Sequence, residues 1–193
     1  MKSTVKFPRA SFLPSQYDVA MVLDARLRKL AGGISASKAA RALARSKSET
    51  ATLTDLERQQ AQEFDATIEA MFLMAAVDGE VSAEEIGQLE ASIAALVDME
   101  IVHDLKLRDT LADLNAKLAA DGWRARLDDV ARRLPTDDGK AFAFRLAAGV
   151  AFVDDEVAHA EAAAIEAFAA TLGLSTEDSQ QILRDVHEEL FGG

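Results

Sequence analysis

Apolar residues recur along most of the chain with the spacing of an amphipathic helix, in which residues three and four positions apart share one face. Three stretches show this most clearly. Their apolar positions are Phe64, Ile68, Met71, Phe72 and Ala75; Ile86, Leu89, Ile93 and Leu96; and Ile165, Phe168, Ala169 and Leu172. Alanine is abundant and no proline occurs between Pro14 and Pro135, which favours helix over strand. The sequence therefore predicts an all-α fold.

Start and stop signals divide this pattern into separate helices. Before residue 50 we expect one helix from about Gln16 to Gly32 and a second opened by Ser35, followed by a linker over Ser46–Thr54. After it we expect a long helix over Asp55–Val77, and six or seven helices in the part of the chain that follows the linker. Their further starts and breaks are expected at Ser82, Gly122, Pro135, Gly173 and Ser175.

An acidic segment occurs twice at an offset of 76 residues. The chain reads AVDGEVSAEE over 76–85 and FVDDEVAHAE over 152–161, and each copy stands between two apolar helical stretches. The same offset relates Leu89 to Ile165 and Leu96 to Leu172. The repeat predicts two helical hairpins that pack about a pseudo-twofold axis into one domain.

Charge divides the chain into two parts. Residues 1–47 hold ten Lys or Arg against two acids, whereas the whole chain has a net charge of −12. We therefore predict a basic helical N-terminal arm and linker over residues 1–50 and an acidic all-helical domain over 51–193. The acidic domain should repel nucleic acid, and the arm is free to pack on it or to touch an anionic surface or partner.

Composition excludes several kinds of site. The chain has no cysteine, which excludes disulfides and thiolate chemistry and suits a reducing cytoplasm. No apolar run approaches the ~20 residues of a membrane-spanning helix. Phosphate-binding loops and nucleophile-elbow motifs are also absent. We therefore expect no enzymatic activity.

Two interpretations fit the acidic segments. In the first, Ser82 and Glu85 form a capping box at the start of a helix, but the second copy has Ala158 where the first has Ser82. In the second, both segments supply carboxylates to one hard cation, Ca²⁺ or alternatively Mg²⁺ or Mn²⁺. The candidate ligands are Asp78, Glu80, Glu85, Asp154, Glu156 and Glu161. An EF-hand is excluded, because its glycine and its final glutamate are missing from the required positions.

A third interpretation is a di-iron site. The pattern Glu-x-x-His occurs at Glu100–His103 and at Glu156–His159, and two such motifs build the metal site of ferritin-like bundles. Glu100 and His103 also share a helical stripe with Leu107, as if one helix carried all three. The charged residues of the helix that begins at Trp123 are expected to form a solvated face.

The two copies together resemble the TerB-like family of bacterial tellurite-resistance proteins. The resemblance rests on MAAVDGEVSAEEIGQLEASIAAL and VAFVDDEVAHAEAAAIEAFAATLGLS and covers about 64–190. The second copy departs from the family pattern, with Asp155 where Gly79 stands in the first. The resemblance implies an all-helical, non-enzymatic domain with a cation site. It also implies a role in a stress response with a membrane-bound protein partner.

From these observations we expect a metal-binding interaction module of a bacterial stress response, of the tellurite-resistance type. We expect the protein in the cytoplasm. The membrane-bound partner extends this expectation to a peripheral position at the inner membrane face. One alternative is a plain helical scaffold without metal. A second alternative is a ferritin-like di-iron carboxylate protein.

Overall fold

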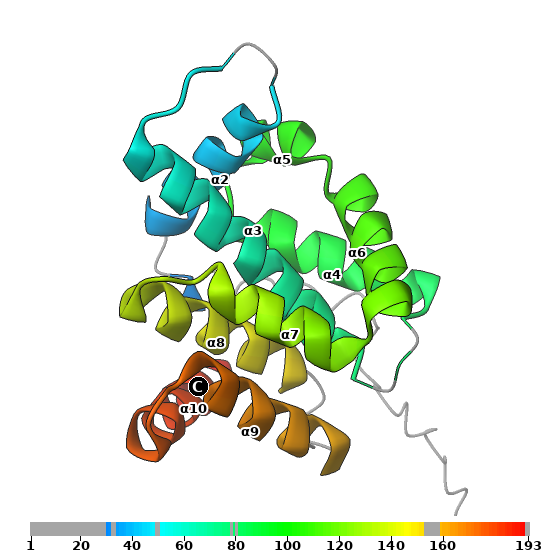
Figure 1. The fold of residues 1–193 in the computed structure, drawn as a ribbon, viewed down its shortest axis with the longest axis vertical. Helices are drawn as coiled ribbons and strands as arrows, with labels where there is room; N and C mark the ends of the chain where they lie inside the picture. Colours follow the sequence, from blue (N-terminus) through cyan, green and yellow to red (C-terminus); the bar gives the residue numbers. More distant parts are fainter. Residues whose placement is uncertain are drawn as a thin grey trace, which may run out of the picture.

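The computed structural model describes residues 30–31, 34–48, 51–77, 79, 81–152 and 159–191. Within these ranges the chain forms helices and no strand, as predicted (Figure 1). The helices are α2 (Ile34–Ser46), α3 (Asp55–Ala75), α4 (Ala83–Ala95), α5 (Met99–Leu105), α6 (Leu107–Asp121), α7 (Trp123–Arg132), α8 (Asp137–Ala151), α9 (His159–Leu172) and α10 (Thr176–Phe191). None of the described helices is long and apolar enough to span a membrane. The predicted helix from Gln16 lies outside the described residues.

Side-chain caps fix the starts of several helices. Ser82 caps α4 as predicted, and at the start of α10 the Asp178 amide donates to Ser175 Oγ over 3.0 Å. Each cap satisfies an amide that has no partner inside its helix. Gly122 and Gly173 have positive φ angles of 81° and 72°, a conformation that glycine adopts readily at a helix end. The predicted breaks at these positions are confirmed.

The segment after α4 differs from the prediction. A single stripe from Glu100 through Leu107 was expected, but Lys106 adopts a left-handed conformation with φ of 49° and separates α5 from α6. Residues 51–193 therefore hold eight helices among the described residues rather than six or seven. The break is hidden in the sequence because Glu100, His103 and Leu107 stand three and four residues apart, as in one helix. Leu105 and Leu107 are both buried, which the break at Lys106 makes possible.

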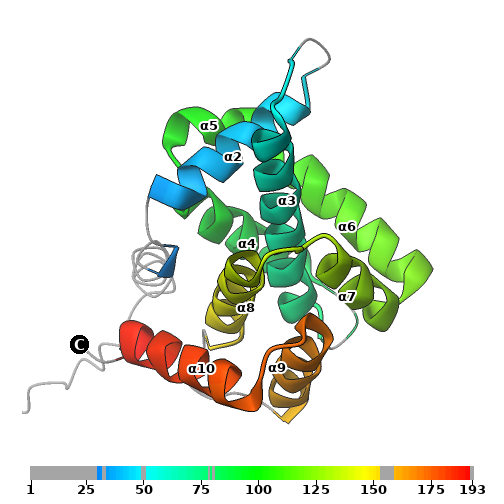
Figure 2. The ribbon, with the colours of Figure 1, turned by 60° about the vertical axis from the view of Figure 1, so that its left-hand side comes forward.

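Helix α3 occupies the centre of the molecule, with α2, α4, α6, α7 and α8 packed against it (Figures 1 and 2). Every residue of α3 from Ala66 to Met74 is buried. A helix that is apolar almost all round must be covered on every side. The remaining helices meet this requirement by surrounding α3.

The two predicted hairpins are α3–α4 and α8–α9, and α3 packs against α8. Helices α3 and α8 contact each other at positions that are related by the 76-residue offset of the repeat. Glu63 lies against Gly139, 76 residues later, and a Cβ atom added there would approach Glu63 Cδ to 3.0 Å. Thr136 Oγ donates a hydrogen bond of 2.7 Å to the Glu63 carboxylate. Both helices run in the same general direction in the two views (Figures 1 and 2), so they end at the same end of the pair.

The described part of the N-terminal arm packs on the body. Helix α2 lies against α3 and α5, and Ala36, Ala40 and Leu43 are buried in the common core. Arg41 pairs with Asp98 over 3.0 Å. The boundary at residue 50 stays a prediction, although the apolar face of α2 covers part of α3.

We expect Leu43→Ala to lower the free energy of unfolding by about 2–5 kcal/mol, because a buried leucine would leave a cavity. Leu43 is 5% exposed, whereas Leu56 is 64% exposed, so Leu56→Ala should change stability by less than about 0.5 kcal/mol. Urea denaturation of both variants measures the difference. Equal stabilities would mean that α2 does not pack on α3 in solution.

Candidate functional site: the acidic turns and the ion pairs beside them

Glu85 is the one predicted metal ligand whose side chain the structure describes, and it forms the capping box of α4. Its Oε2 accepts a hydrogen bond of 2.7 Å from the Ser82 amide, and the Glu85 amide donates to Ser82 Oγ over 3.2 Å. Hydrogen bonds to the carboxyl from the Ser82 side chain, and secondly from the Ser82 backbone amide, lower the pKa of Glu85, because they favour its charged form. Glu85 is exposed and charged at neutral pH, with Oε1 outside the capping hydrogen bond.

The other five predicted ligands fall beyond what the structure describes. Asp78, Glu80, Asp154 and Glu156 lie outside the described residues, and Glu161 lies in α9 with no described side chain. Among the side chains that are described, no three acids or histidines are grouped to hold a metal ion. The shared cation site therefore stays a prediction.

The described flanks of the two acidic segments do lie at the same end of the molecule. Ala75 ends α3 twelve residues after Glu63, and Ala151 ends α8 twelve residues after Gly139. Since Glu63 and Gly139 touch and the helices share a direction (Figure 2), equal lengths of helix bring both ends to a similar height. The chain enters both acidic segments from neighbouring points.

The Glu-x-x-His motif at Glu100 and His103 is not placed for a di-iron site. Both side chains are exposed, and α5 is a helix of seven residues on the surface. Ligands of a ferritin-like site project into the core of a bundle from long helices. The motif at Glu156–His159 lies outside the described side chains.

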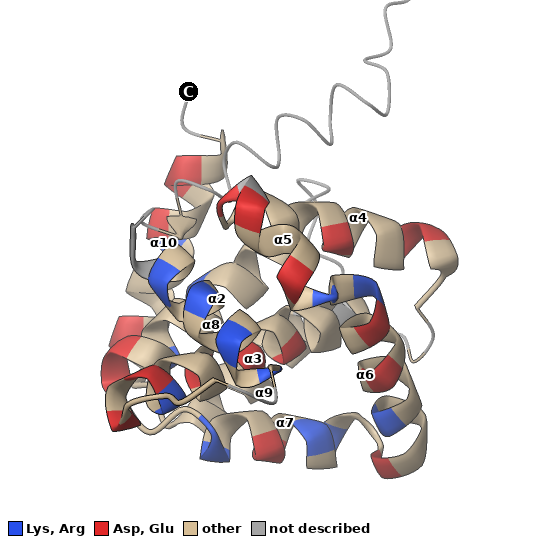
Figure 3. Ribbon diagram, turned by 90° about the horizontal axis from the view of Figure 1, so that it is seen from above, with Lys and Arg blue, Asp and Glu red and all other residues tan. Residues whose placement is uncertain are grey.

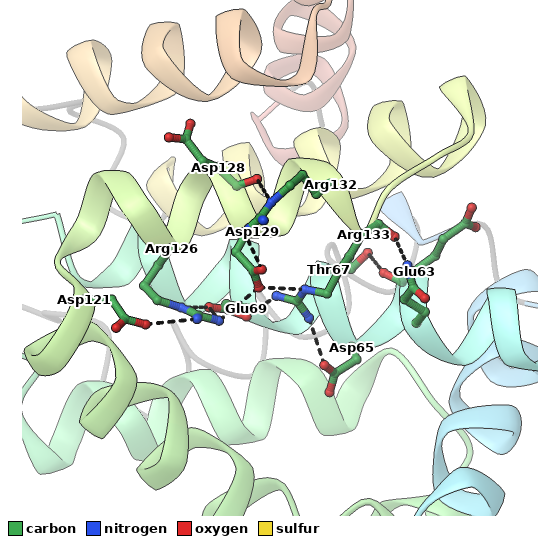
Figure 4. Close-up of polar contacts among 11 residues, drawn as sticks. Glu63, Asp65, Thr67, Glu69, Asp121, Arg126, Asp128, Asp129, Arg132 and Arg133 are labelled. Carbon is green, nitrogen blue, oxygen red and sulfur yellow. Dashed lines mark hydrogen bonds and ion pairs between the residues drawn. The ribbon is translucent and has the colours of Figure 1, made fainter.

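A group of buried ion pairs joins α3 to α7 (Figure 4). At its centre is Glu69 of α3, whose side chain is 3% exposed. Arg126 Nε donates to Glu69 Oε1 over 2.7 Å, and Arg133 donates to Oε2. Burial alone would lower the pKa of Arg126, but the hydrogen bond and the charge of Glu69 outweigh it and raise the pKa.

Further carboxylates surround the two arginines. Asp129 Oδ2 lies 3.2 Å from Arg126 Nη2 and 3.0 Å from Arg133 Nε. The second contact is an ion pair without a hydrogen bond, since Arg133 Nε has no hydrogen-bond partner. Asp65 accepts from Arg133 over 2.9 Å and Asp121 from Arg126 over 3.2 Å.

These contacts correct the expectation of a solvated face on α7. Arg126, Asp129 and Arg133 lie three and four residues apart, so one face of the helix carries all three toward α3. Glu69 was the available signal, because it is the single charged residue between Asp65 and Asp78. An acid within an apolar stretch indicates a buried carboxylate that requires a cationic partner.

Trp123 extends the same attachment toward the first acidic turn. Its indole Nε1 donates to the Leu73 carbonyl over 2.9 Å. That carbonyl is one of the last four of α3, which have no partner within the helix. Helix α7 therefore holds α3 along its second half and at the end that leads into residues 76–82.

We expect Arg133→Met to lower the free energy of unfolding by about 3–5 kcal/mol, because it leaves Glu69 and Asp129 short of a partner. The matched control is Arg124→Met on the same helix. Arg124 is 67% exposed and lies 3.9 Å from Asp128, so its removal should cost less than about 1 kcal/mol. Denaturant titration compares them, and equal losses would contradict a central role for the buried ion pairs.

The chain was also compared with known proteins. No curated protein and no solved structure matches it. The family profile described as tellurite resistance protein TerB matches residues 64–184, which include both acidic segments, the first hairpin from Phe64 onward and the whole of the second hairpin. This range covers more than half of the chain, and therefore the protein belongs to the TerB family of tellurite resistance proteins.

Proposed function

We propose that this tellurite-resistance-type domain is a non-enzymatic interaction module in which the two acidic turns share one divalent cation. The observation that carries the proposal is the register of α3 and α8. Glu63 lies against Gly139, and the two helices end at the same end of the pair (Figure 1). Asp78, Glu80 and Glu85 then come from one turn, and Asp154, Glu156 and Glu161 from the other.

Electrostatics favours an ion between such turns. Two carboxylates ~6 Å apart repel by roughly 3 kcal/mol at an effective dielectric constant of 20. A divalent cation replaces this repulsion with attraction. A ligand set made only of oxygen atoms suits Ca²⁺, with Mg²⁺ and Mn²⁺ as the alternatives.

Capping by Glu85 is compatible with binding. Its Oε2 serves the Ser82 amide, whereas Oε1 is outside the capping hydrogen bond. In the second copy Ala158 removes the hydroxyl, but the acid at Glu161 is retained. An acid that is present without its capping partner is more simply explained by a role of its own.

The proposed setting is the cytoplasm of a bacterium under stress. The partner in this proposal is another protein that is bound to the membrane. Binding of the ion would order the two acidic turns for contact with this partner. Nucleic acid is disfavoured as a partner of the acidic body, since residues 48–193 carry a large excess of acids. The basic N-terminal segment is the part suited to an anionic surface.

A plain scaffold without metal is the second candidate. The complete capping box of Ser82 and Glu85 favours it, because capping alone accounts for the acid in the first copy. The ferritin-like alternative has less support, given the exposed positions of Glu100 and His103.

We expect Ca²⁺, Mg²⁺ or Mn²⁺ to raise the melting temperature of the full chain. At a hundred times the dissociation constant, an ion bound only by the folded state stabilises it by ~2.7 kcal/mol, which corresponds to about 5–10 °C for a chain of this size. Glu85→Gln together with Glu161→Gln should abolish the increase. Glutamine still serves in a capping box, so this loss would report the charge and not the cap.

The control for that experiment is Glu57→Gln. Glu57 forms the same capping box with Thr54 at the start of α3, far from the acidic turns. The control variant should keep the full response to the ion. If no ion raises the melting temperature of the native chain, or the double variant responds fully, the acidic turns do not bind the cation.

A further inference from the structure

A basic pocket opens between α2 and α5, beside the corner where α5 meets α6. Its volume is about 510 Å³, and it is lined by the cationic residues Arg41, Arg45, Lys47 and Lys106, with His103 and one acid, Asp104, at the same surface. Ala44 and the buried Ile101 supply an apolar part. This size is in the range of small-molecule sites.

The pocket contrasts with the rest of the molecule. The chain has 33 acids against 21 Lys or Arg, yet four of the cations meet here. Seen from above, Lys and Arg on α2 and at the α5–α6 corner lie on either side of α5, which itself carries acidic residues (Figure 3). Arg41 and Arg45 have acidic partners, Asp98 and Glu57. The first ion pair is largely open to water and the second is half-exposed, and exposed pairs contribute little.

Lys47 is held without a carboxylate. Its Nζ donates to the Leu105 carbonyl over 2.7 Å and to Thr110 Oγ over 2.8 Å, so the two hydrogen bonds go to neutral acceptors. An ammonium group has three donors, which leaves one for a ligand. Desolvation is the largest cause of the lowered pKa of Lys47 and outweighs the longer-range charges of Asp65, Asp113 and Asp109, which raise it. A bound anion would add to the charges that favour the protonated form.

Lys106 places another cation at the corner. Its φ of 49° is the one positive value among the described residues other than glycine. A glycine would fit this backbone without the steric penalty that a Cβ atom incurs. The lysine at this position therefore carries a charge to the pocket where local conformation alone would favour a smaller residue.

We propose that this pocket binds a phosphate group, either of a small soluble phosphate compound or of an anionic lipid headgroup. Phosphate matches the surface because several cations surround one compact anion and Lys47 offers a donor. The apolar side at Ile101 would accommodate the part of the ligand that carries no charge. The α2 residues of the pocket precede the region matched by the TerB profile, whereas its α5 residues and Lys106 lie within it, so the pocket joins the N-terminal helix to the family domain. It lies near the N-terminal end of α3, away from the acidic turns.

The test uses the full chain labelled with ¹⁵N and titrated with sodium pyrophosphate. Saturable shifts are expected at the amides of α2 and α5. Lys106→Gly should weaken binding by about tenfold or more, as expected for the loss of one charged hydrogen bond, and the glycine fits the backbone. Lys117→Gln is the matched control, because Lys117 is exposed on α6 about three turns from the corner.

A second arm uses vesicles of phosphatidylcholine with and without phosphatidylserine. Binding of pyrophosphate alone assigns the pocket to a soluble phosphate compound. Sedimentation with the serine lipid that depends on Lys106 assigns it to a headgroup. The proposal is overturned if neither probe binds, or if Lys106→Gly and Lys117→Gln weaken binding equally, since that result would indicate unspecific attraction.

Discussion

The ion pairs of Glu69 with Arg126 and Arg133 are the interaction on which the packing of α3 against α7 depends. Helix α3 is buried on all sides between Ala66 and Met74, and Glu69 is its one charged side chain there. A carboxylate that water cannot reach requires a partner. Arg126 of α7 and Arg133, the C-cap residue of that helix, reach its two oxygens (Figure 4), which leaves α7 little freedom to rotate or slide along α3.

The fixed position of α7 bears on the proposed cation site. Trp123 begins α7 and bonds the Leu73 carbonyl, so the same attachment reaches the end of α3 from which the first acidic segment leaves. Helix α8 is held beside α3 because Thr136 donates a hydrogen bond to Glu63 and Gly139 lies against the Glu63 side chain. A ligand set drawn from two separate turns needs both helix ends to be held, because small displacements of oxygen ligands weaken their hold on an ion.

Local signals in the sequence predicted the helices, their caps at Ser82 and Ser175, and the buried positions of the repeat. Leu89 and Ile165, 76 residues apart, are both buried, since each faces its core at the same point of its hairpin. The break at Lys106 was missed, because Glu100, His103 and Leu107 keep helical spacing across it and a lysine gives no sign of a positive φ angle. The partners of Glu69 were missed because they lie 57 and 64 residues away, and periodicity within one helix cannot show which faces meet.

The candidate site was predictable only as a set of residue types. Acids at matched positions of a repeat indicate carboxylates of similar local role, but the distance between the two turns depends on how α3 and α8 pack. That packing was visible only in part. Gly139, in the first turn of α8, permits the close approach of Glu63, but a glycine this close to Pro135 fits a turn equally well in the sequence.

The residues before the TerB match are continuous with the domain through α3. The match begins at Phe64, ten residues into this helix, and α3 spans about 30 Å from end to end. Its first turns are capped by Thr54 and carry Glu57, which pairs with Arg45 of α2. The same rigid helix thus leads at one end to the acidic turns and at the other to the basic pocket. An anion bound at α2 and a cation bound at the acidic turns would both stabilise the folded chain. The two ligands would bind at separate sites, because the basic pocket attracts the anion and the acidic turns attract the cation.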